Sequence, residues 1–290
     1  MKAINAPDSN HDQTPNVFSL GFSTCPNDTF MFDALVNGKI DSGGLSFNVH
    51  LADIETLNQL AIKGELDITK ISFGVYSQIQ DTYELLTAGS ALGKGVGPLF
   101  ISRKEFLNPL KEIRTIAIPG KNTTANFLFK MFYPELSNTK EMIFSDIEKA
   151  IIDEEVDAGV IIHENRFTFQ ERGLKKISDL GELWENKTGK PIPLGGIAVR
   201  RTLDENIKRK INSLFRESVE YAFANPEASS EYVRINAQEM SAEVRKKHIK
   251  LYVNEFSIEL GDNGRKSIIL FLKSSRTNGL NVPKENIFIH

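Results

Sequence analysis

The sequence predicts an α/β protein of two lobes with a cleft between them, in which the first lobe is discontinuous along the chain. Over residues 17–79 and 115–162, the hydrophobic pattern alternates between the two-residue period of strands and the 3.6-residue period of helices. Such alternation is typical of strands joined by helical crossovers in a mostly parallel sheet. Short apolar runs beside glycines, 98–102 and 195–199, flank the second stretch and are expected to connect the lobes.

The first stretch contains three expected pairs of a strand and a helix. The strands are 17–22, 45–49 and 66–71, and the helices are 28–36, 54–62 and 75–79. Gly38 follows the first helix, as is typical of helix C-termini. The second strand alternates apolar and polar side chains, which is typical of strands. These elements are expected to begin the first lobe.

The second stretch repeats this order and is followed by helices alone. Its strands are 115–118, 142–144 and 158–162, its helices are 123–132 and 146–152, and further helices are expected at 207–223, 231–235, 242–253 and 265–273. The apolar residues of these later helices recur at steps of three and four, so they are expected to pack on the first lobe. We therefore expect 1–16 to be a disordered tail, 17–99 and 198–290 to form the larger lobe, and 100–197 to form the smaller, inserted lobe.

Composition excludes several classes of protein. The 290 residues include 35 basic and 38 acidic side chains, with no basic face interleaved with aromatics, so nucleic acid is not an expected partner. No segment approaches the roughly 18 apolar residues of a membrane span, and 1–16 lacks the apolar centre of a signal peptide. The single cysteine, Cys25, forms no intramolecular disulfide and is expected to be a packed or pocket-lining thiol. We expect a cytoplasmic protein with no membrane partner.

His163 is the first candidate for chemistry. It follows the apolar run 158–162, and groups just beyond the carboxyl end of a strand line the ligand crevice in open α/β sheets. With an ordinary pKa of about 6.5, a histidine there can act as a neutral base near pH 7. Lys70, Ile71 and Ser72 end another strand and are expected at the same edge, where Lys70 would attract an acidic ligand. A hydrogen-bonded structural histidine and a solvated lysine are the alternative interpretations.

Two strand-to-helix turns also carry polar groups. Ser23, Asn27 and Asp28 stand at the start of the first helix, where hydroxyls and free N–H groups present donors to a polar ligand. Thr123 and Thr124 open a later helix, whose N–H groups and positive dipole end suit a carboxylate. Helix capping without a ligand is the alternative for both turns, with Asn27 or Asp28 as the N-cap of the first.

Other motifs fail on their spacing. Residues 90–98 are rich in glycine, but a Walker signature requires glycine where Ala88 stands and Ser or Thr where Gly95 stands, so we expect a flexible passage beside the cleft. No metal-ligand cluster is visible, since Phe167 stands where a zinc helix would place its second histidine. His248 lies on one apolar stripe of its helix and is expected to be buried in a structural role.

Together, several segments resemble one known family. They are Ser23-Thr24-Cys25-Pro26-Asn27-Asp28-Thr29-Phe30, Thr69-Lys70-Ile71-Ser72, Ala91-Leu92-Gly93-Lys94-Gly95-Val96-Gly97-Pro98-Leu99, Thr123-Thr124-Ala125, Ile161-Ile162-His163-Glu164-Asn165-Arg166-Phe167-Thr168 and Pro193-Leu194-Gly195. The chain after the tail resembles the 1,4-dihydroxy-6-naphthoate synthases of the futalosine route to menaquinone. Thr24 replaces a proline that many relatives carry.

The resemblance implies a periplasmic-binding-protein-like (type 2) fold that acts as an enzyme inside the cell. It implies a lyase that converts cyclic dehypoxanthinylfutalosine to 1,4-dihydroxy-6-naphthoate, releases a three-carbon sugar-derived fragment and uses no metal or organic cofactor. The histidine matching His163 is the proton acceptor in that family, and the residues matching 70–72, Thr123 and Thr124 contact the substrate. Arg166 lies in the same motif as His163 and is included among the substrate contacts.

Two other functions stay open at this stage. One is chorismate dehydratase, a sister enzyme class of the same pathway, and the other is a non-catalytic solute-binding module, because fold does not fix function. In each case the expected partner is a small-molecule carboxylate. A homodimer stays open as well.

Overall fold

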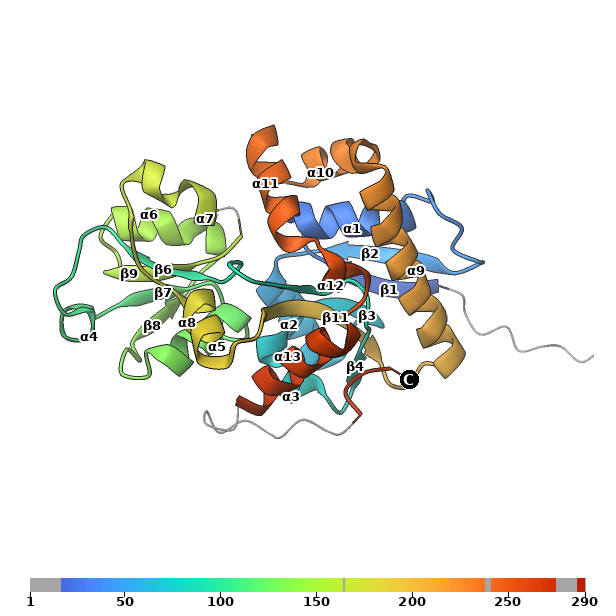
Figure 1. Cartoon of the computed structure of the whole chain (residues 1–290), viewed down its shortest axis with the longest axis horizontal. Coiled ribbons are helices and arrows are strands. Elements are labelled where there is room, and N and C mark those ends of the chain that lie inside the picture. Colours follow the sequence, from blue (N-terminus) through green and yellow to red (C-terminus); the bar gives the residue numbers. More distant parts are fainter. Residues whose placement is uncertain (1–16, 164, 238–240, 275–285, 290) are drawn as a thin grey trace, which may run out of the picture.

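The computed structural model of the chain describes residues 17–163, 165–237, 241–274 and 286–289. It has two lobes, each built around its own sheet, as Figure 1 shows. The predicted tail at 1–16 lies outside the described residues. Within the described ranges, no helix is both long enough and apolar enough to cross a membrane.

The first sheet has six strands in the order β2-β1-β3-β11-β4, with β5 paired to β11. The strands are β1 (Val17–Phe22), β2 (Ser46–Leu51), β3 (Ile68–Ser72), β4 (Tyr83–Leu85), β5 (Ala91–Gly93) and β11 (Ile192–Arg200). β1 pairs in parallel with β2 and β3, whereas β11 runs antiparallel to β3, β4 and β5. The expectation of a flexible passage at 90–98 was wrong for residues 91–93, which form the paired and buried strand β5.

The second sheet has five strands in the order β10-β6-β9-β7-β8. They are β6 (Leu99–Ser102), β7 (Ile116–Ile118), β8 (Thr139–Glu141), β9 (Ala158–Ile161) and β10 (Lys175–Asp179). β7 pairs in parallel with β8 and β9, while β6 and β10 are antiparallel to their neighbours. The lobe boundaries expected after residues 99 and 197 fall inside β6 and β11, the strands that lead from one lobe to the other.

Two further expectations about strands were wrong. The sheets are mixed rather than mostly parallel, because the segments that link the lobes enter each sheet in the reverse direction. The strand expected at 142–144 lies three residues earlier, at β8. β8 is a polar edge strand with one neighbour, so it carries no apolar signal, whereas Phe144 belongs to the 3₁₀ turn η2 (Phe144–Asp146) and is buried.

Helices cover both sheets (Figure 1). On the first lobe these are α1 (Pro26–Val36), α2 (Ile54–Lys63), η1 (Phe73–Val75), α3 (Tyr76–Ile79), α9 (Glu205–Ala224), η4 (Pro226–Ser229), α10 (Ser230–Asn236), α11 (Ala242–Tyr252), α12 (Glu255–Ile258) and α13 (Gly261–Ser274). On the second lobe they are α4 (Pro109–Glu112), α5 (Thr124–Phe132), α6 (Ile147–Ile152), α7 (Asn165–Thr168), η3 (Phe169–Arg172) and α8 (Leu180–Thr188). The long helix α9 packs on α1, which places the late helices on the first lobe as expected.

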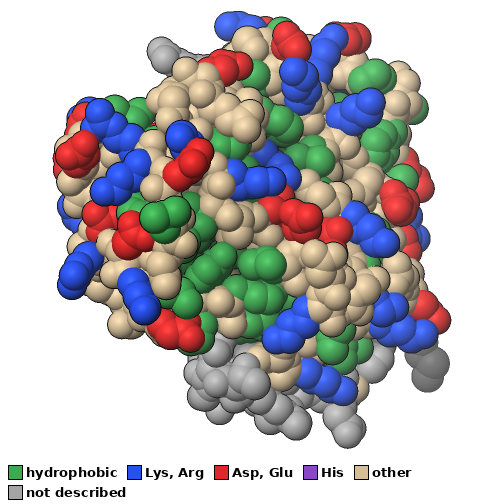
Figure 2. Space-filling model, turned by 60° about the vertical axis from the view of Figure 1, so that its left-hand side comes forward, with side chains coloured by type: hydrophobic (Ala, Val, Ile, Leu, Met, Phe, Trp, Pro, Cys, Tyr) green, Lys and Arg blue, Asp and Glu red, His purple; other side chains and the backbone are tan. Residues whose placement is uncertain are grey.

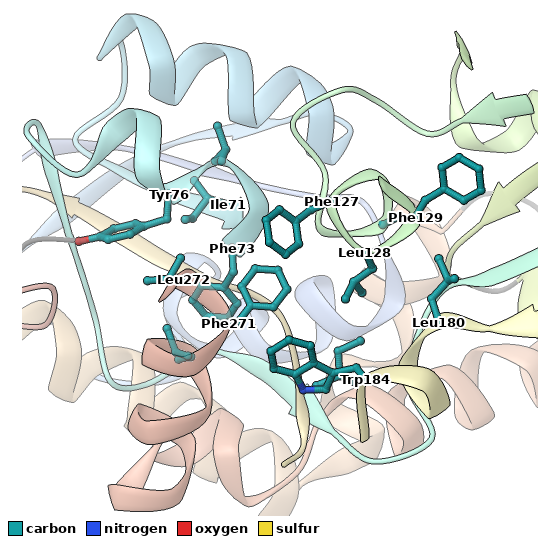
Figure 3. Close-up of a cluster of buried hydrophobic side chains, with 14 of the residues drawn as sticks. Ile71, Phe73, Tyr76, Phe127, Leu128, Phe129, Leu180, Trp184, Phe271 and Leu272 are labelled. Atoms are coloured by element: carbon teal, nitrogen blue, oxygen red, sulfur yellow. The ribbon is translucent and has the colours of Figure 1, made fainter. Parts of the chain in front are cut away.

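One hydrophobic cluster joins the two lobes, and Figure 3 shows its centre. The ring of Phe271 from α13 lies 4.5 Å from the ring of Phe127 and 5.4 Å from that of Trp184, measured between centroids. Phe127 and Trp184 belong to α5 and α8 of the second lobe, so apolar burial holds the lobes together beside the linking strands. On the face shown in Figure 2, Lys and Arg side chains are interspersed with Asp and Glu.

Candidate functional site

A cavity between the lobes, open to the solvent, includes about 660 Å³ of space not filled by protein atoms, part of which is open solvent. Its walls come from strands of the first sheet, from residues beside β6 and β9 of the second sheet, and from the starts of α1 and α5. The lining residues are Ser23, Asn27, Asp28, Ile54, Lys70, Ile71, Ser72, Ala91, Val96, Pro98, Thr123, Thr124, Ala125, Ile162, His163, Leu194, Gly195 and Tyr252. Nine of the ten residues expected at the site from the sequence therefore line one cavity, and the tenth, Arg166, does not.

The turn into α1 is organised around the carboxylate of Asp28. Ser23 donates to it from its hydroxyl at 2.7 Å and from its backbone N–H at 3.3 Å, and Asn27 donates from its side chain at 2.8 Å. The expectation that Asn27 or Asp28 caps α1 was wrong: Cys25 is the N-cap residue and Pro26 begins the helix. Because proline has no N–H to satisfy, the helix starts there and leaves Asp28 free to face the cavity.

Lys70 forms a buried ion pair with Asp28 inside the cavity. Its Nζ lies 3.0 Å from Asp28 Oδ1 and donates to the carbonyl of Gly89 at 2.9 Å. Both side chains are less than 5% exposed. The pair joins the end of β3 to the start of α1, so this lysine is a fixed charge within the wall rather than a solvated one.

Asn58 of α2 orients Ser72, a role that no pattern in the sequence indicated. The side-chain amide of Asn58 donates to Ser72 Oγ at 3.1 Å, and its carbonyl oxygen accepts from Ser72 N at 2.9 Å. Since Ser72 Oγ already accepts this hydrogen bond, its own proton is directed elsewhere, and Ser72 lines the cavity. The hydroxyl is thereby set as a donor to a ligand.

The start of α5 forms the opposite wall. Thr123 is its N-cap and accepts from Asn126 N at 3.2 Å, as expected. Thr124 donates its hydroxyl to the carbonyl of Leu194 and accepts from Gly74 N at 3.1 Å, so the helix start is bonded to the first lobe. A Cβ at Gly74 would lie 2.8 Å from the carbonyl oxygen of Thr123, which explains why glycine is needed for this approach. N–H groups of a first helical turn lack partners within the helix and suit a carboxylate.

We expect Thr123→Val to weaken both the fold and the binding of a carboxylate ligand. Loss of the cap should cost about 1 kcal/mol of stability, measured by urea unfolding, and KM should rise because the first turn of α5 loosens. Asp204→Ala is the matched control, since Asp204 caps α9 by accepting from Asn206 N at 2.8 Å and does not line the cavity. A rise in KM of equal size in the control would contradict a specific role for the α5 start.

His163 closes the cavity just beyond β9, with Phe144 of its own lobe 4.9 Å from its ring. From the first lobe, Cys25 places its Sγ 3.8 Å from His163 Nε2. The backbone of His163 has φ of 58°, a left-handed conformation that costs a residue other than glycine about 1–3 kcal/mol. A conformation held at this cost is a feature that clusters at functional sites.

The surroundings of His163 favour its neutral form. Burial lowers the pKa of the imidazole from 6.5 to about 4, the carboxylates of Asp28 and Asp53 oppose this, and the charge of Lys70 adds to it. His163 is therefore an uncharged base at neutral pH. It lines the same cavity as the start of α5, whose donors suit an anion, and this arrangement is able to hold a carboxylate and remove a proton from the same molecule.

Arg166 does not line the cavity but lies behind the residues that do. Its guanidinium donates to the carbonyl of Gly97 and pairs with Asp179 at 2.9 Å, so it braces α7 against the loop that leads into β6. Tyr252 is one of the lining residues that the sequence did not indicate as site residues, because it sits among the apolar positions of a distant helix. Among the described residues, no three His, Cys, Asp or Glu side chains are grouped closely enough to hold a metal ion.

Comparison with known proteins places the chain in one family. A model of the family described as menaquinone biosynthesis matches residues 18–276. A 1,4-dihydroxy-6-naphthoate synthase of Thermus thermophilus is 43% identical over 264 residues, which are 91% of this chain and 96% of that protein. A 1,4-dihydroxy-6-naphthoate synthase of Streptomyces coelicolor is 41% identical over 270 residues, with 91% and 95% of the two chains covered.

Solved structures confirm the fold. A protein of Archaeoglobus fulgidus superposes with a TM-score of 0.86 at 32% identity, over 93% of this chain and 99% of that one. The alkanesulfonate-binding protein SsuA from Xanthomonas axonopodis pv. citri superposes with a TM-score of 0.66 at 11% identity, over 95% of this chain and 96% of that one. At this low identity, the similarity shows a shared binding-protein-like fold and nothing about function. The chain is a binding-protein-like α/β protein that belongs to the menaquinone biosynthesis family.

Proposed function

We propose that the protein is a 1,4-dihydroxy-6-naphthoate synthase, a carbon–carbon lyase with His163 as its proton acceptor. The substrate is cyclic dehypoxanthinylfutalosine, and the products are the naphthoate and a three-carbon sugar-derived fragment. The observation that carries the chemical part is a neutral imidazole in an interlobe cavity that the start of α5 also lines. The curated synthases that are 41–43% identical over 91% of the chain support the substrate.

The residues divide the work between binding and proton removal. The start of α5 and the hydroxyl of Ser72 receive the carboxylate of the substrate, which fixes the rest of the molecule against His163. His163 then removes a proton beside the ring, and cleavage of the neighbouring carbon–carbon bond lets that ring become aromatic. A base in this position typically contributes about 10² to 10⁴ in rate, and contact between the lobes excludes water from the site.

Turnover of the cyclic substrate tests this proposal. Purified protein should convert cyclic dehypoxanthinylfutalosine to 1,4-dihydroxy-6-naphthoate, with the mass of the product followed by liquid chromatography and mass spectrometry. Chorismate supplied in parallel should stay unchanged. Consumption of chorismate without action on the cyclic substrate would identify the sister dehydratase instead. Tight binding of the cyclic substrate without any product would favour a solute-binding module.

We also propose that the reaction runs in the cytoplasm without a metal or an organic cofactor. The support is the reaction type, since proton removal followed by aromatisation requires a base and no redox change. Protein dialysed against a chelator and passed through gel filtration should keep its turnover. Loss of activity that is restored by adding back one metal ion would contradict this part of the proposal.

The low pKa of His163 predicts the acidic limb of the pH profile. The base must be neutral to accept a proton, so kcat/KM should stay level as the pH falls through 6.5 and should decline only near pH 4. Circular dichroism at each pH separates this decline from acid unfolding. A decline centred near pH 6.5, the ordinary value for histidine, would show that the free enzyme does not keep His163 desolvated.

A further inference from the structure

Two histidines from different lobes lie face to face beside the cavity. His163 follows β9 of the second lobe, and His248 lies on α11, which packs against α1 and β5 of the first lobe. Their ring centroids are 6.0 Å apart and their planes differ by 15°. On its other side, His248 lies 4.6 Å from the ring of Tyr252, which lines the cavity. The contact between the two imidazoles therefore exists only when the lobes are together.

His248 is buried in a way that a purely structural role does not explain. The side chain is 0% exposed, and neither ring nitrogen has a hydrogen-bond partner within the described part of the chain. A buried polar group without a partner costs about 1–3 kcal/mol, and a phenylalanine would fill a similar volume without that cost. A polar ring that is kept at such a cost, in contact with the proposed base, indicates a function for its nitrogens.

We propose that His248 is a positioning residue for the reaction, which holds the plane of His163 across the cleft and stabilises the charge that His163 gains with the proton. This inference rests on the role proposed for His163. It adds to the site a residue that touches the base rather than the substrate.

The charge balance around the two rings supports this role. Full burial, and then repulsion from His163, hold the pKa of His248 well below its ordinary value, so this ring stays neutral. A neutral imidazole attracts a neighbouring imidazolium through its ring face, and its nitrogen lone pair can accept a hydrogen bond from it through one water. The other charges that act on His163 are those of Asp28, Asp53 and Lys70, which are part of the walls.

The test compares His248→Phe with the conservative variant His248→Asn. In His248→Phe, the melting temperature should be equal to or higher than that of the wild type, because the unpartnered nitrogens are removed. In contrast, kcat should fall about tenfold with KM unchanged within about twofold, the loss expected for one hydrogen bond to a charged group. His248→Asn should recover part of kcat, since its side chain restores a polar group.

His50→Phe is the matched control, because His50 is exposed on the edge strand β2 and lies outside the cavity. It should leave kcat and the melting temperature unchanged. Wild-type kcat in His248→Phe, or a fall in kcat that only accompanies a lower melting temperature, would overturn the inference. Full turnover by His163→Ala would instead refute the proposed base itself, so the two failures are distinguishable.

Discussion

His163→Ala should lower kcat by about 10² to 10⁴ while the protein stays folded. The substitution removes the neutral imidazole but leaves the carboxylate-binding start of α5, so KM should change much less than kcat. The measurement is steady-state formation of the naphthoate from the cyclic substrate. Because the backbone at His163 has φ of 58°, the alanine carries the same conformational strain and the stability of the variant stays comparable.

His163→Asn is the companion variant for this experiment. Asparagine tolerates the left-handed conformation and is polar, but it cannot accept a proton at neutral pH. It should therefore be as inactive as alanine and at least as stable. Turnover near the wild-type rate in either folded variant would refute the assignment of His163 as the proton acceptor.

Lys70→Met should destabilise the protein by about 3–5 kcal/mol, the largest effect on stability that we expect at the site. The substitution leaves the carboxylate of Asp28 charged and less than 5% exposed, with hydrogen bonds from Ser23 and Asn27 but without its cation. Urea unfolding measures the change in the free energy of unfolding. An unchanged dependence of this free energy on urea concentration shows that the variant and the wild type unfold in comparable transitions.

A double variant separates the ion pair from the packing of its side chains. Asp28→Asn combined with Lys70→Met removes both charges and should recover much of the lost stability, because no unpaired charge is then buried. Lys63→Met is the matched control, since the pair of Lys63 with Glu65 is exposed at 3.7 Å and should contribute less than about 1 kcal/mol. Equal losses of stability in Lys70→Met and Lys63→Met would show that burial does not make the Lys70–Asp28 pair more important for stability than an exposed pair.

The segments that carry polar groups at strand ends were predictable because they obey a local rule. Residues at the carboxyl ends of strands line the ligand crevice of open α/β sheets, so Lys70 to Ser72 and His163 were assigned to the cavity from their strand-end positions. They do not share one sheet edge, however, because β3 and β9 belong to the sheets of different lobes. Thr123 as a cap follows from equally local chemistry, a hydroxyl before an apolar helix. The cavity includes these residues, as well as Ser23, Asn27 and Asp28.

Predictions that required knowledge of the partner of a segment were less accurate. β8 and β5 are short edge or linking strands whose composition gives no strand signal, and their pairing depends on β7 and β11. Arg166 carries a charge suited to a carboxylate ligand, but Asp179, which the sequence does not place beside it, already holds its guanidinium. Asn58 acts through Ser72, a contact that spans 14 residues and leaves no spacing pattern.

By itself, the sequence determined the α/β class, the two lobes, the family and most of the polar residues of the site, because periodicity, capping and strand-end position are local properties of the chain. The tertiary structure alone decided that Lys70 is paired with Asp28, that His163 has a lowered pKa and that His248 faces it from the other lobe. These features depend on burial and on contacts between segments far apart along the chain, such as Cys25 and His163 or His163 and His248. Desolvation is a property of such packing, and no local pattern encodes it.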